Sequence, residues 1–398
     1  MRVMFTMQSA LGHFHPLVPL ARALQAAGHA VAFAASGSFA PTVEALGFRY
    51  FPAGFDRRDI PWPRLVPAMA GLGGEALDIF IEVRLYAGFR AQLAVPDYVA
   101  IARDWRPDVI VREAFEYGGC VAAEQLGLPH AVVGVGSYRG PDWQRAGRVR
   151  QLDRLRRACG LSPDPDLAML ARYLYLSFTP PSFEDPAAPL PPTAHALRHV
   201  AFDRSGDEGL PAWAARLGRR PTVYATLGTV YNRHTESLAA ILAGLRDEPV
   251  EVVLTVGRTQ DPAQFGPQPG HVHVERYIPQ TLILPRCDLV VTRGGWNTTL
   301  ATLAAGLPLV MLPISADQPE NARRAAALGA AAIIDPAGRT PAAIRAAVRA
   351  VLADPAYRRS AGRVRDEMAA LPGLDHAVAL LERLAAEKRP ILSSPDRP

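Results

Sequence analysis

Short apolar runs alternate with amphipathic stretches in the first half of the chain, a pattern typical of parallel β-strands connected by α-helices. The predicted strands cover residues 2–7, 30–35, 109–111 and 130–135, and the predicted helices cover residues 16–27, 99–106 and 114–126. Pro16 near the first turn of the first helix and Gly28 after its last turn support the limits of that helix. The segment 51–96 has no clear period and is rich in apolar and aromatic residues, so we expect it to be irregular.

A second series of the same kind follows a polar, glycine-containing stretch. Its predicted strands cover residues 222–226, 250–256, 271–275, 289–292, 309–312 and 331–334, and helices from residue 355 to about residue 388 close the chain. A chain of 398 residues is long enough for two α/β domains. We therefore predict two Rossmann-like parallel-sheet domains facing across a cleft, with ligands beyond the C-terminal ends of the strands. The expected limits are 1–202 for the first domain, 203–220 for a linker, 221–375 for the second domain and 376–398 for a C-terminal helix and tail.

A predicted strand, a turn of two glycines and a helix in residues 289–305 form an anion site. A helix that begins at such a turn presents unpaired N–H groups and the positive end of its dipole. Arg293 stands beside this turn, so phosphate is the expected anion. Asp317 and Gln318 follow the next strand, at the same edge of the sheet, and can bind hydroxyl groups. Together these groups predict a sugar nucleotide as the ligand.

This region resembles the donor-binding signature of the family-1 nucleotide-sugar glycosyltransferases of the GT-B fold, especially that of actinobacterial enzymes that glycosylate natural products. The motifs that carry the resemblance are YIPQ at residues 277–280, RGGWNTT at 293–299 and ADQPENA at 316–322. The resemblance extends over most of the chain, including GHFHPLVPLARALQAAGHAV at residues 12–31. It implies an inverting transfer of a sugar from a nucleotide donor to a hydroxyl group of a hydrophobic aglycone.

The resemblance also implies which residues bind the donor. Tyr277 is expected to stack on the nucleobase, the backbone of Ile278 to read its edge, and Asp317 to hold hydroxyl groups of the sugar. The full set of expected donor-binding residues is Thr229, Tyr277, Ile278, Gln280, Arg293, Gly294, Gly295, Asn297, Thr298, Asp317 and Gln318.

Two departures from the family pattern make the prediction more specific. Arg293 replaces the usual histidine of the phosphate motif and brings a permanent positive charge. Ala301 replaces a glutamate that binds both ribose hydroxyls in relatives that use UDP-sugars. A donor without a 2′-hydroxyl on its nucleoside is therefore expected, which favours a dTDP-sugar over a UDP-sugar. The transferred sugar is expected to be a deoxysugar.

The loop after the first strand offers two candidates for a general base. His13 begins an H-x-x-P motif at the position where the family keeps its base, and His15 is the alternative. A neutral imidazole can accept the proton of a hydroxyl group, and a carboxylate that orients the ring helps it to do so. Glu113, after the strand at 109–111, is the expected partner of His13, with Glu116 as the less favoured choice.

The acceptor is expected to bind to an aromatic wall formed by segment 51–96 and the loop near 137–144. The wall would contain Phe55, Trp62, Met69, Phe80, Tyr86, Phe89, Tyr138 and Trp143, of which Phe55, Trp62, Phe89 and Tyr138 are the main candidates. The D-x-D motif at Asp164 and Asp166 resembles metal sites of other transferases, but it precedes a predicted helix over 167–174, where aspartate caps the N-terminus. We expect transfer without a metal or another cofactor, because Arg293 and the helix dipole supply the positive charge.

The amino-acid composition gives limited information about which class of protein this is. The net charge of +5 comes almost wholly from scattered arginines, since Lys388 is the only lysine, so a nucleic-acid surface is not expected. The three cysteines are far apart and fit free thiols in a reducing cytoplasm. The sequence contains no run of about eighteen apolar residues, so no membrane span is predicted. We expect a cytoplasmic monomer or homodimer.

Four other functions remain open at this stage. They are a UDP-sugar-dependent transferase that inactivates macrolides or xenobiotics, a C-glycosylating enzyme, a sugar-nucleotide epimerase and a non-catalytic partner protein that binds a sugar nucleotide. A dehydrogenase is disfavoured because no G-x-G-x-x-G motif follows the first strand.

Overall fold

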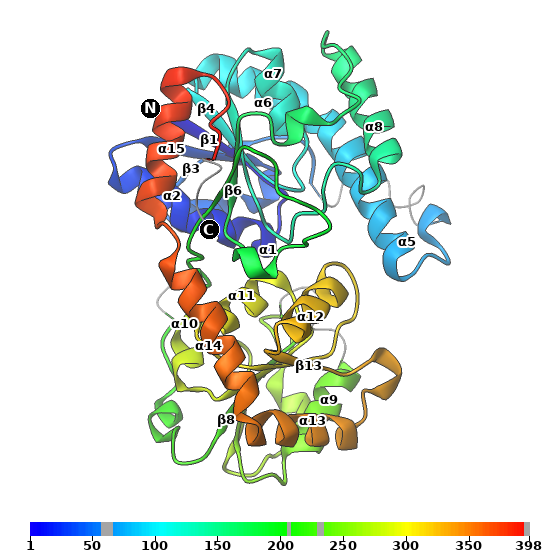
Figure 1. The fold of residues 1–398 in the computed structure, drawn as a ribbon, viewed down its shortest axis with the longest axis vertical. Coiled ribbons are helices and arrows are strands. Elements are labelled where there is room, and N and C mark those ends of the chain that lie inside the picture. Colours follow the sequence, from blue (N-terminus) through cyan, green and yellow to red (C-terminus); the bar gives the residue numbers. More distant parts are fainter. Residues whose placement is uncertain (57–66, 205–207, 229–234, 394–398) are drawn as a thin grey trace. The chain divides into compact units, whose positions relative to one another are not determined.

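The computed structural model describes residues 1–56, 67–204, 208–228 and 235–393, and the chain divides into two compact units (Figure 1). Unit 1 contains Met1–Thr179, Glu184–Arg198 and Pro372–Pro398, and unit 2 contains Pro180–Phe183 and His199–Leu371. The stretch expected as a linker is part of unit 2, because Trp213 stacks on His273 with ring centroids 3.8 Å apart.

Unit 1 is built on a parallel sheet with the strand order β3-β2-β1-β4-β5-β6-β7. Its strands are β1 Arg2–Thr6, β2 Ala30–Ala35, β3 Arg49–Pro52, β4 Val109–Glu113, β5 His130–Val133, β6 Leu174–Ser177 and β7 Ala194–Ala196. The central pairs bring Val3 opposite Val31 and Val109, and these three side chains are 5% exposed or less. A parallel strand covered on both faces reads as a continuous apolar run, which explains why the central strands were predictable.

Helices cover this sheet and extend away from it. They are α1 Leu11–Phe14, α2 Val18–Ala26, α3 Ala40–Glu44, α5 Gly74–Ile79, α6 Ala91–Trp105, α7 Gly118–Gln125, α8 Arg145–Ala158 and α15 Leu374–Glu387, with the π-helical segment η4 Phe80–Arg90 and the 3-10 turns η1 His15–Leu17, η2 Gly37–Phe39 and η5 Ala168–Leu170. The C-terminal helix α15 packs on α2, and His29 Nε2 lies 2.9 Å from Glu382 Oε1. The segment set apart at 376–398 therefore contributes its helix to unit 1.

Two expectations about unit 1 were wrong. Segment 51–96 is helical from Gly74 onwards, because α5, η4 and α6 follow one another without interruption from Gly74 to Trp105. The π-helical turns of η4 do not match the 3.6-residue period of an α-helix, and Pro96 inside α6 normally breaks a helix. The sequence therefore shows no helical period in this segment. The helix expected at 167–174 is only the 3-10 turn η5, followed by strand β6.

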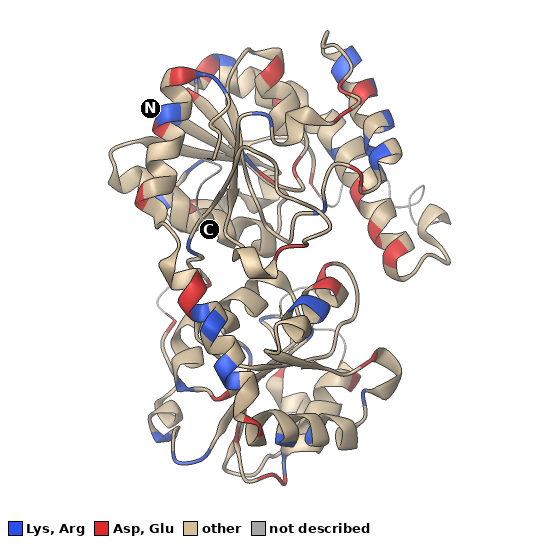
Figure 2. Cartoon of the chain, in the orientation of Figure 1, with Lys and Arg blue, Asp and Glu red and all other residues tan. Residues whose placement is uncertain are grey.

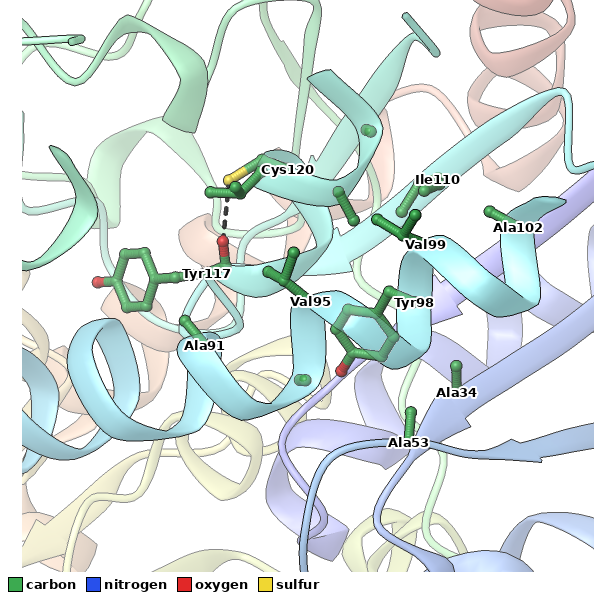
Figure 3. Packing of buried hydrophobic residues seen from close by; sticks show 14 of the residues in the cluster. Ala34, Ala53, Ala91, Val95, Tyr98, Val99, Ala102, Ile110, Tyr117 and Cys120 are labelled. Carbon is green, nitrogen blue, oxygen red and sulfur yellow. Dashed lines mark hydrogen bonds between the residues drawn. The ribbon is translucent and has the colours of Figure 1, made fainter. Parts of the chain in front are cut away.

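The contact between α6 and α7 forms a large part of the core of unit 1 (Figure 3). Val95, Tyr98 and Val99 from α6 pack there with Ile110 from β4, and each is 6% exposed or less. The Cys120 thiol of α7 donates to the carbonyl oxygen of Tyr117 at 3.3 Å, and burial raises the pKa of the thiol to about 12. This thiol is therefore protonated and unreactive at neutral pH.

Unit 2 is built on a second parallel sheet with the order β10-β9-β8-β11-β12-β13. Its strands are β8 Thr222–Thr226, β9 Glu251–Thr255, β10 Val272–Glu275, β11 Leu289–Thr292, β12 Leu309–Met311 and β13 Ala331–Ile333. Each of the six predicted strands is present, with ends within one residue of the prediction. The helices are α9 Thr235–Leu245, α10 Gln280–Ile283, α11 Trp296–Ala304, α12 Gln318–Ala327, α13 Pro341–Ala353 and α14 Pro355–Ala370, with the 3-10 turns η6 Pro181–Phe183, η7 Ala212–Arg216, η8 Pro262–Phe265, η9 Leu284–Arg286 and η10 Pro336–Gly338.

Acidic and basic residues are interspersed along the helices of both units (Figure 2). None of the helices in the described parts of the chain is long and apolar enough to cross a membrane.

Candidate active site

His13 and Glu113 of unit 1 form a close pair at the C-terminal ends of β1 and β4. His13 lies in α1 and Glu113 ends β4, and His13 Nδ1 is 3.1 Å from Glu113 Oε1. The Glu113 side chain is completely buried, whereas the His13 side chain is 21% exposed. The backbone N–H groups of Gln8 and Phe115 donate to the two carboxylate oxygens at 3.2 and 2.7 Å. Two backbone N–H groups therefore fix the Glu113 carboxylate, and the His13 imidazole that it faces is accessible to solvent.

Aromatic rings restrict the orientation of His13. The rings of Phe115 and Tyr86 meet the imidazole edge to face, with centroids 5.7 and 6.3 Å away. With Nδ1 directed at Glu113, Nε2 is the nitrogen that can accept a proton from a ligand. His15 follows in the 3-10 turn η1, and its ring lies 6.1 Å from that of Phe14.

Glu116 has a different role from Glu113. Its carboxylate accepts hydrogen bonds from Thr6 Oγ1 at 2.6 Å and from the N–H groups of Gly118 and Gly119 at 2.7 and 2.8 Å. It caps the N-terminus of α7 and connects it to β1. A Cβ atom at Gly119 would lie 2.3 Å from Thr6 Oγ1, so glycine is required for this close approach. Glu116 is therefore a structural carboxylate, although the sequence offered it as an alternative partner for histidine.

An open pocket of unit 1 lies beside Gln8, whose backbone N–H donates to Glu113. Phe55 lines the pocket, together with Gln8 and Arg90. Phe89 supports Phe55 from the side, with ring centroids 4.9 Å apart. The pocket thus contains one of the expected acceptor-binding residues and has a second packed against it.

Tyr138 and Trp143, which the structure describes, are not part of this pocket lining. Tyr138 follows β5 and packs edge to face on Tyr175 at 5.4 Å, and its backbone N–H donates to Glu184 Oε2 at 3.1 Å. Trp143 is covered by Arg139, whose guanidinium carbon lies 4.5 Å from the ring centroid. Trp62 lies outside the described residues.

The residues of the predicted anion site of unit 2 lie at the N-terminus of α11. Strand β11 ends at Thr292, and α11 begins at Trp296 after an extended Gly295 with φ −61° and ψ 142°. The Arg293 guanidinium lies directly over Gly228, where an added Cβ would be 3.1 Å from Nη2. Gly228 has a φ of +68°, so two constraints favour glycine there. Arg293 and the start of α11 therefore place positive charge at one point.

Asp317 connects the start of α12 to this anion site. Its Oδ2 accepts from the Trp296 N–H at 3.0 Å and from Asn321 Nδ2 at 2.7 Å, and Asn321 Nδ2 also donates to the Gly294 carbonyl oxygen at 2.9 Å. Asp317 thus caps the first N–H of α11, and the amides of Asn297 and Thr298 follow in the same turn. Asn321, which the sequence analysis did not single out, fixes the orientation of Asp317.

Gln318 is buried and shapes the loop before α12. Its Oε1 accepts from the N–H groups of Ile314 and Ser315 at 2.9 and 3.3 Å, and the side chain is 1% exposed. Ala316 in this loop adopts a left-handed conformation with φ 60°. Because Oε1 of Gln318 already accepts these two hydrogen bonds, Gln318 could bind a sugar hydroxyl only through Nε2.

Tyr277 stands at the predicted position of the base-stacking residue, and its hydroxyl donates to the carbonyl oxygen of Asp203. Burial raises the pKa of this phenol, so it remains protonated and can donate. The Arg258 guanidinium carbon lies 3.8 Å from the ring centroid and covers one face. Arg258 was missed because nothing in its local sequence indicates a contact with YIPQ.

Gln280 of the YIPQ motif donates from Nε2 to Thr298 Oγ1 at 3.0 Å. Thr229, another expected donor-binding residue, lies outside the described residues.

His199 is a further unexpected neighbour of the anion site. Its ring meets that of Trp296 edge to face at 5.6 Å. Burial lowers the pKa of His199 to about 4, so the imidazole is neutral at pH 7.

The two aspartates of the D-x-D motif have different partners. Asp164 is buried and accepts from the N–H groups of Ala168 and Met169 at 3.1 and 2.7 Å, and Asp166 is exposed and pairs with Arg145. Asp164 therefore caps the turn that follows it, as a helix-capping aspartate would.

Comparisons with known proteins place this geometry in a family. The Erythromycin biosynthesis protein CIII-like family matches with its N-terminal domain over residues 77–220 and its C-terminal domain over residues 239–384. The chain is 32% identical to 4'-demethylrebeccamycin synthase of Lentzea aerocolonigenes, over 96% of this chain and 99% of the relative. It is also 32% identical to tylactone mycaminosyltransferase of Streptomyces fradiae, over 98% of this chain and 93% of the relative.

A solved structure agrees with these matches. The spinosyn rhamnosyltransferase SpnG complexed with thymidine diphosphate superimposes with a TM-score of 0.79 at 26% identity, over 96% of this chain and 100% of that chain. The same protein complexed with spinosyn aglycone superimposes with a TM-score of 0.81. The resemblance stated from the motifs is thus confirmed: the chain is a glycosyltransferase and belongs to the family-1 natural-product glycosyltransferases of the GT-B fold.

Proposed function

We propose that this enzyme transfers a deoxysugar from a dTDP-sugar to a hydroxyl group of a hydrophobic aglycone, with inversion at the anomeric carbon and without a metal ion. The observation that carries the proposal is the His13–Glu113 pair, in which a buried carboxylate faces an accessible imidazole at 3.1 Å. In the proposed reaction His13 Nε2 accepts the proton of the acceptor hydroxyl, and the acceptor oxygen displaces the nucleoside diphosphate. Glu113 is the positioning residue that stabilises the imidazolium.

Unit 2 is proposed to bind the leaving group. Negative charge develops on the diphosphate as the glycosidic bond breaks, and Arg293 and the N-terminus of α11 supply the opposite charge. This arrangement supports transfer without a divalent cation, since a metal would supply the same stabilisation. Tyr277 is proposed to stack on the base with the ring face opposite Arg258.

The proposed preference for dTDP rests on Ala301. This residue is 7% exposed and packs in an apolar cluster with Ile278 and Val290, so α11 offers no carboxylate to a ribose 2′-hydroxyl there. Solved relatives are complexed with thymidine diphosphate, which agrees with this preference. UDP-sugars remain the alternative donor.

The proposal is tested in two steps. First, the melting temperature of the full chain is measured with dTDP, UDP and GDP; dTDP should stabilise it most, and a larger effect of UDP would contradict the Ala301 argument. Second, dTDP-glucose and dTDP-rhamnose are incubated with a panel of aromatic and macrolide aglycones, and products are analysed by mass spectrometry and NMR. An inverted glycoside is expected, whereas consumption of the donor without acceptor would favour an epimerase. Donor binding without any product would favour a non-catalytic partner protein.

A further inference from the structure

The pocket of unit 1 combines an apolar wall with one cationic side chain. Met7 and Phe55 belong to the apolar wall, and Ser9, Ser36 and Arg90 add polar groups. Arg90 is the last residue of the π-helical segment η4, and π-helical turns are often found at functional sites. The established family role of the chain does not account for this arginine.

Arg90 is held in place by neutral groups. Its Nη1 donates to Gln8 Oε1 at 2.5 Å, and its guanidinium carbon lies 5.5 Å from the Phe55 ring centroid and 5.8 Å from that of Tyr86. No carboxylate of the described residues forms an ion pair with Arg90. A guanidinium is always charged, and a half-buried cation that pairs with none of the described carboxylates favours an anionic ligand.

Glu116 is an acidic residue of the same pocket, but other groups bind its carboxylate. Glu116 also lines the pocket, but its oxygens accept hydrogen bonds from Thr6, Gly118 and Gly119. Its acceptor sites are therefore already used within the α7 cap, and burial raises the pKa of this carboxyl group, which disfavours its charged form.

Arg90 is also connected to the proposed base. The Gln8 side chain accepts from Arg90, and the Gln8 backbone N–H donates to Glu113, which faces His13. The Tyr86 ring contacts both Arg90 and His13. A ligand group bound at Arg90 is thus beside the site where His13 would deprotonate a hydroxyl group.

We propose that Arg90 determines acceptor specificity by binding an anionic oxygen of the acceptor, a carboxylate or an ionised phenol, while the apolar wall holds its ring system. This inference rests on the proposed function in that the occupant of the pocket is taken to be the sugar acceptor. A guanidinium binds such an oxygen through charge-assisted hydrogen bonds that a neutral side chain cannot replace. The preferred acceptor is therefore a flat apolar molecule with an acidic group.

The test measures binding by the full chain without any donor, using 2-naphthoate and its neutral analogue naphthalene-2-carboxamide as probes in isothermal titration calorimetry. Arg90→Met removes the charge, and Arg90→Lys keeps it. Arg84→Met is the matched control, because Arg84 is exposed on the same π-helical segment. Circular dichroism and melting curves show whether each variant is folded.

Arg90→Met should weaken the binding of 2-naphthoate by about 10- to 100-fold and that of the carboxamide by less than about threefold, which matches the strength of a hydrogen bond to a charged group. Arg90→Lys should retain part of the preference, and Arg84→Met should behave as the wild type. Equal losses for both probes would mean that Arg90 only positions Gln8, and this would refute the proposal. Absence of 2-naphthoate binding to the wild type at millimolar concentration would also refute it. Arg90-dependent binding by a chain that transfers no sugar would leave this site intact and reject the proposed function instead.

Discussion

Replacing Glu113 with glutamine removes the negative charge beside His13 and changes the shape of the side chain very little. The glutamine oxygen can still accept one of the backbone N–H groups that hold the carboxylate, those of Gln8 and Phe115. The substitution therefore isolates the electrostatic contribution of Glu113 to the imidazolium that forms when His13 accepts a proton.

The distance sets the size of the expected effect. Two unit charges at 3.1 Å attract each other by about 5 kcal/mol at an effective dielectric constant of about 20, and by about 1 kcal/mol in bulk water. The Glu113 side chain is fully buried and the His13 side chain is 21% exposed, so an intermediate value of about 3 kcal/mol applies. We therefore expect kcat to fall by about 10²-fold in Glu113→Gln, with about 10⁴-fold as the upper limit.

The assay follows release of dTDP with the aglycone that gives the highest turnover. Glu116→Gln is the matched control, because Glu116 is equally buried but caps α7. This control should lose about 1–3 kcal/mol of unfolding free energy and keep kcat within about threefold. Unchanged kcat in Glu113→Gln, or an equal loss in folded Glu116→Gln, would refute the assigned roles.

Three further predictions concern unit 2. Arg293→Met should lower kcat by about 10²–10³-fold and reduce the thermal stabilisation by dTDP, because one cation facing the diphosphate is lost; kcat within about threefold of wild type would contradict this. Excess EDTA should leave turnover unchanged, and a loss that Mg²⁺ restores would disprove metal-independent transfer. Burial lowers the pKa of His199 from 6.5 to about 4, so the unfolded state takes up a proton first as the pH falls. Between about pH 6.5 and pH 4 the wild type should therefore lose up to about 3 kcal/mol more unfolding free energy in urea titrations than His199→Phe, and parallel losses would show that His199 does not titrate in this way.

The sheet of unit 2 was predictable because its strands are short, apolar and bounded by turns. In β8 and β11 all residues are buried, so no exposed position interrupts either strand. The helical run that begins at Gly74 was predicted only near its end, over 99–106, since its central part is π-helical and α6 contains Pro96. Local period and composition describe regular elements well and describe a π-helix poorly.

The candidate site was predictable as a set of positions, but the division of roles within it was not. Glu113 and Glu116 are both acidic and three residues apart, and only the course of the turn before α7 decides which faces His13. The contact of Arg258 with Tyr277 and that of Arg90 with Gln8 join separate elements of the chain. Such contacts depend on how distant elements pack together, and the local sequence around each residue does not indicate this.

The most direct test of the central claim is the turnover number of His13→Ala compared with that of His15→Ala. If His13 is the general base, kcat should fall by about 10²–10⁴-fold in His13→Ala and by no more than about threefold in His15→Ala. The melting-temperature increase with dTDP should stay the same in both variants, because the proposed donor site lies in unit 2. Turnover retained by His13→Ala would contradict the assignment of the base, and turnover lost only in His15→Ala would transfer that role to His15.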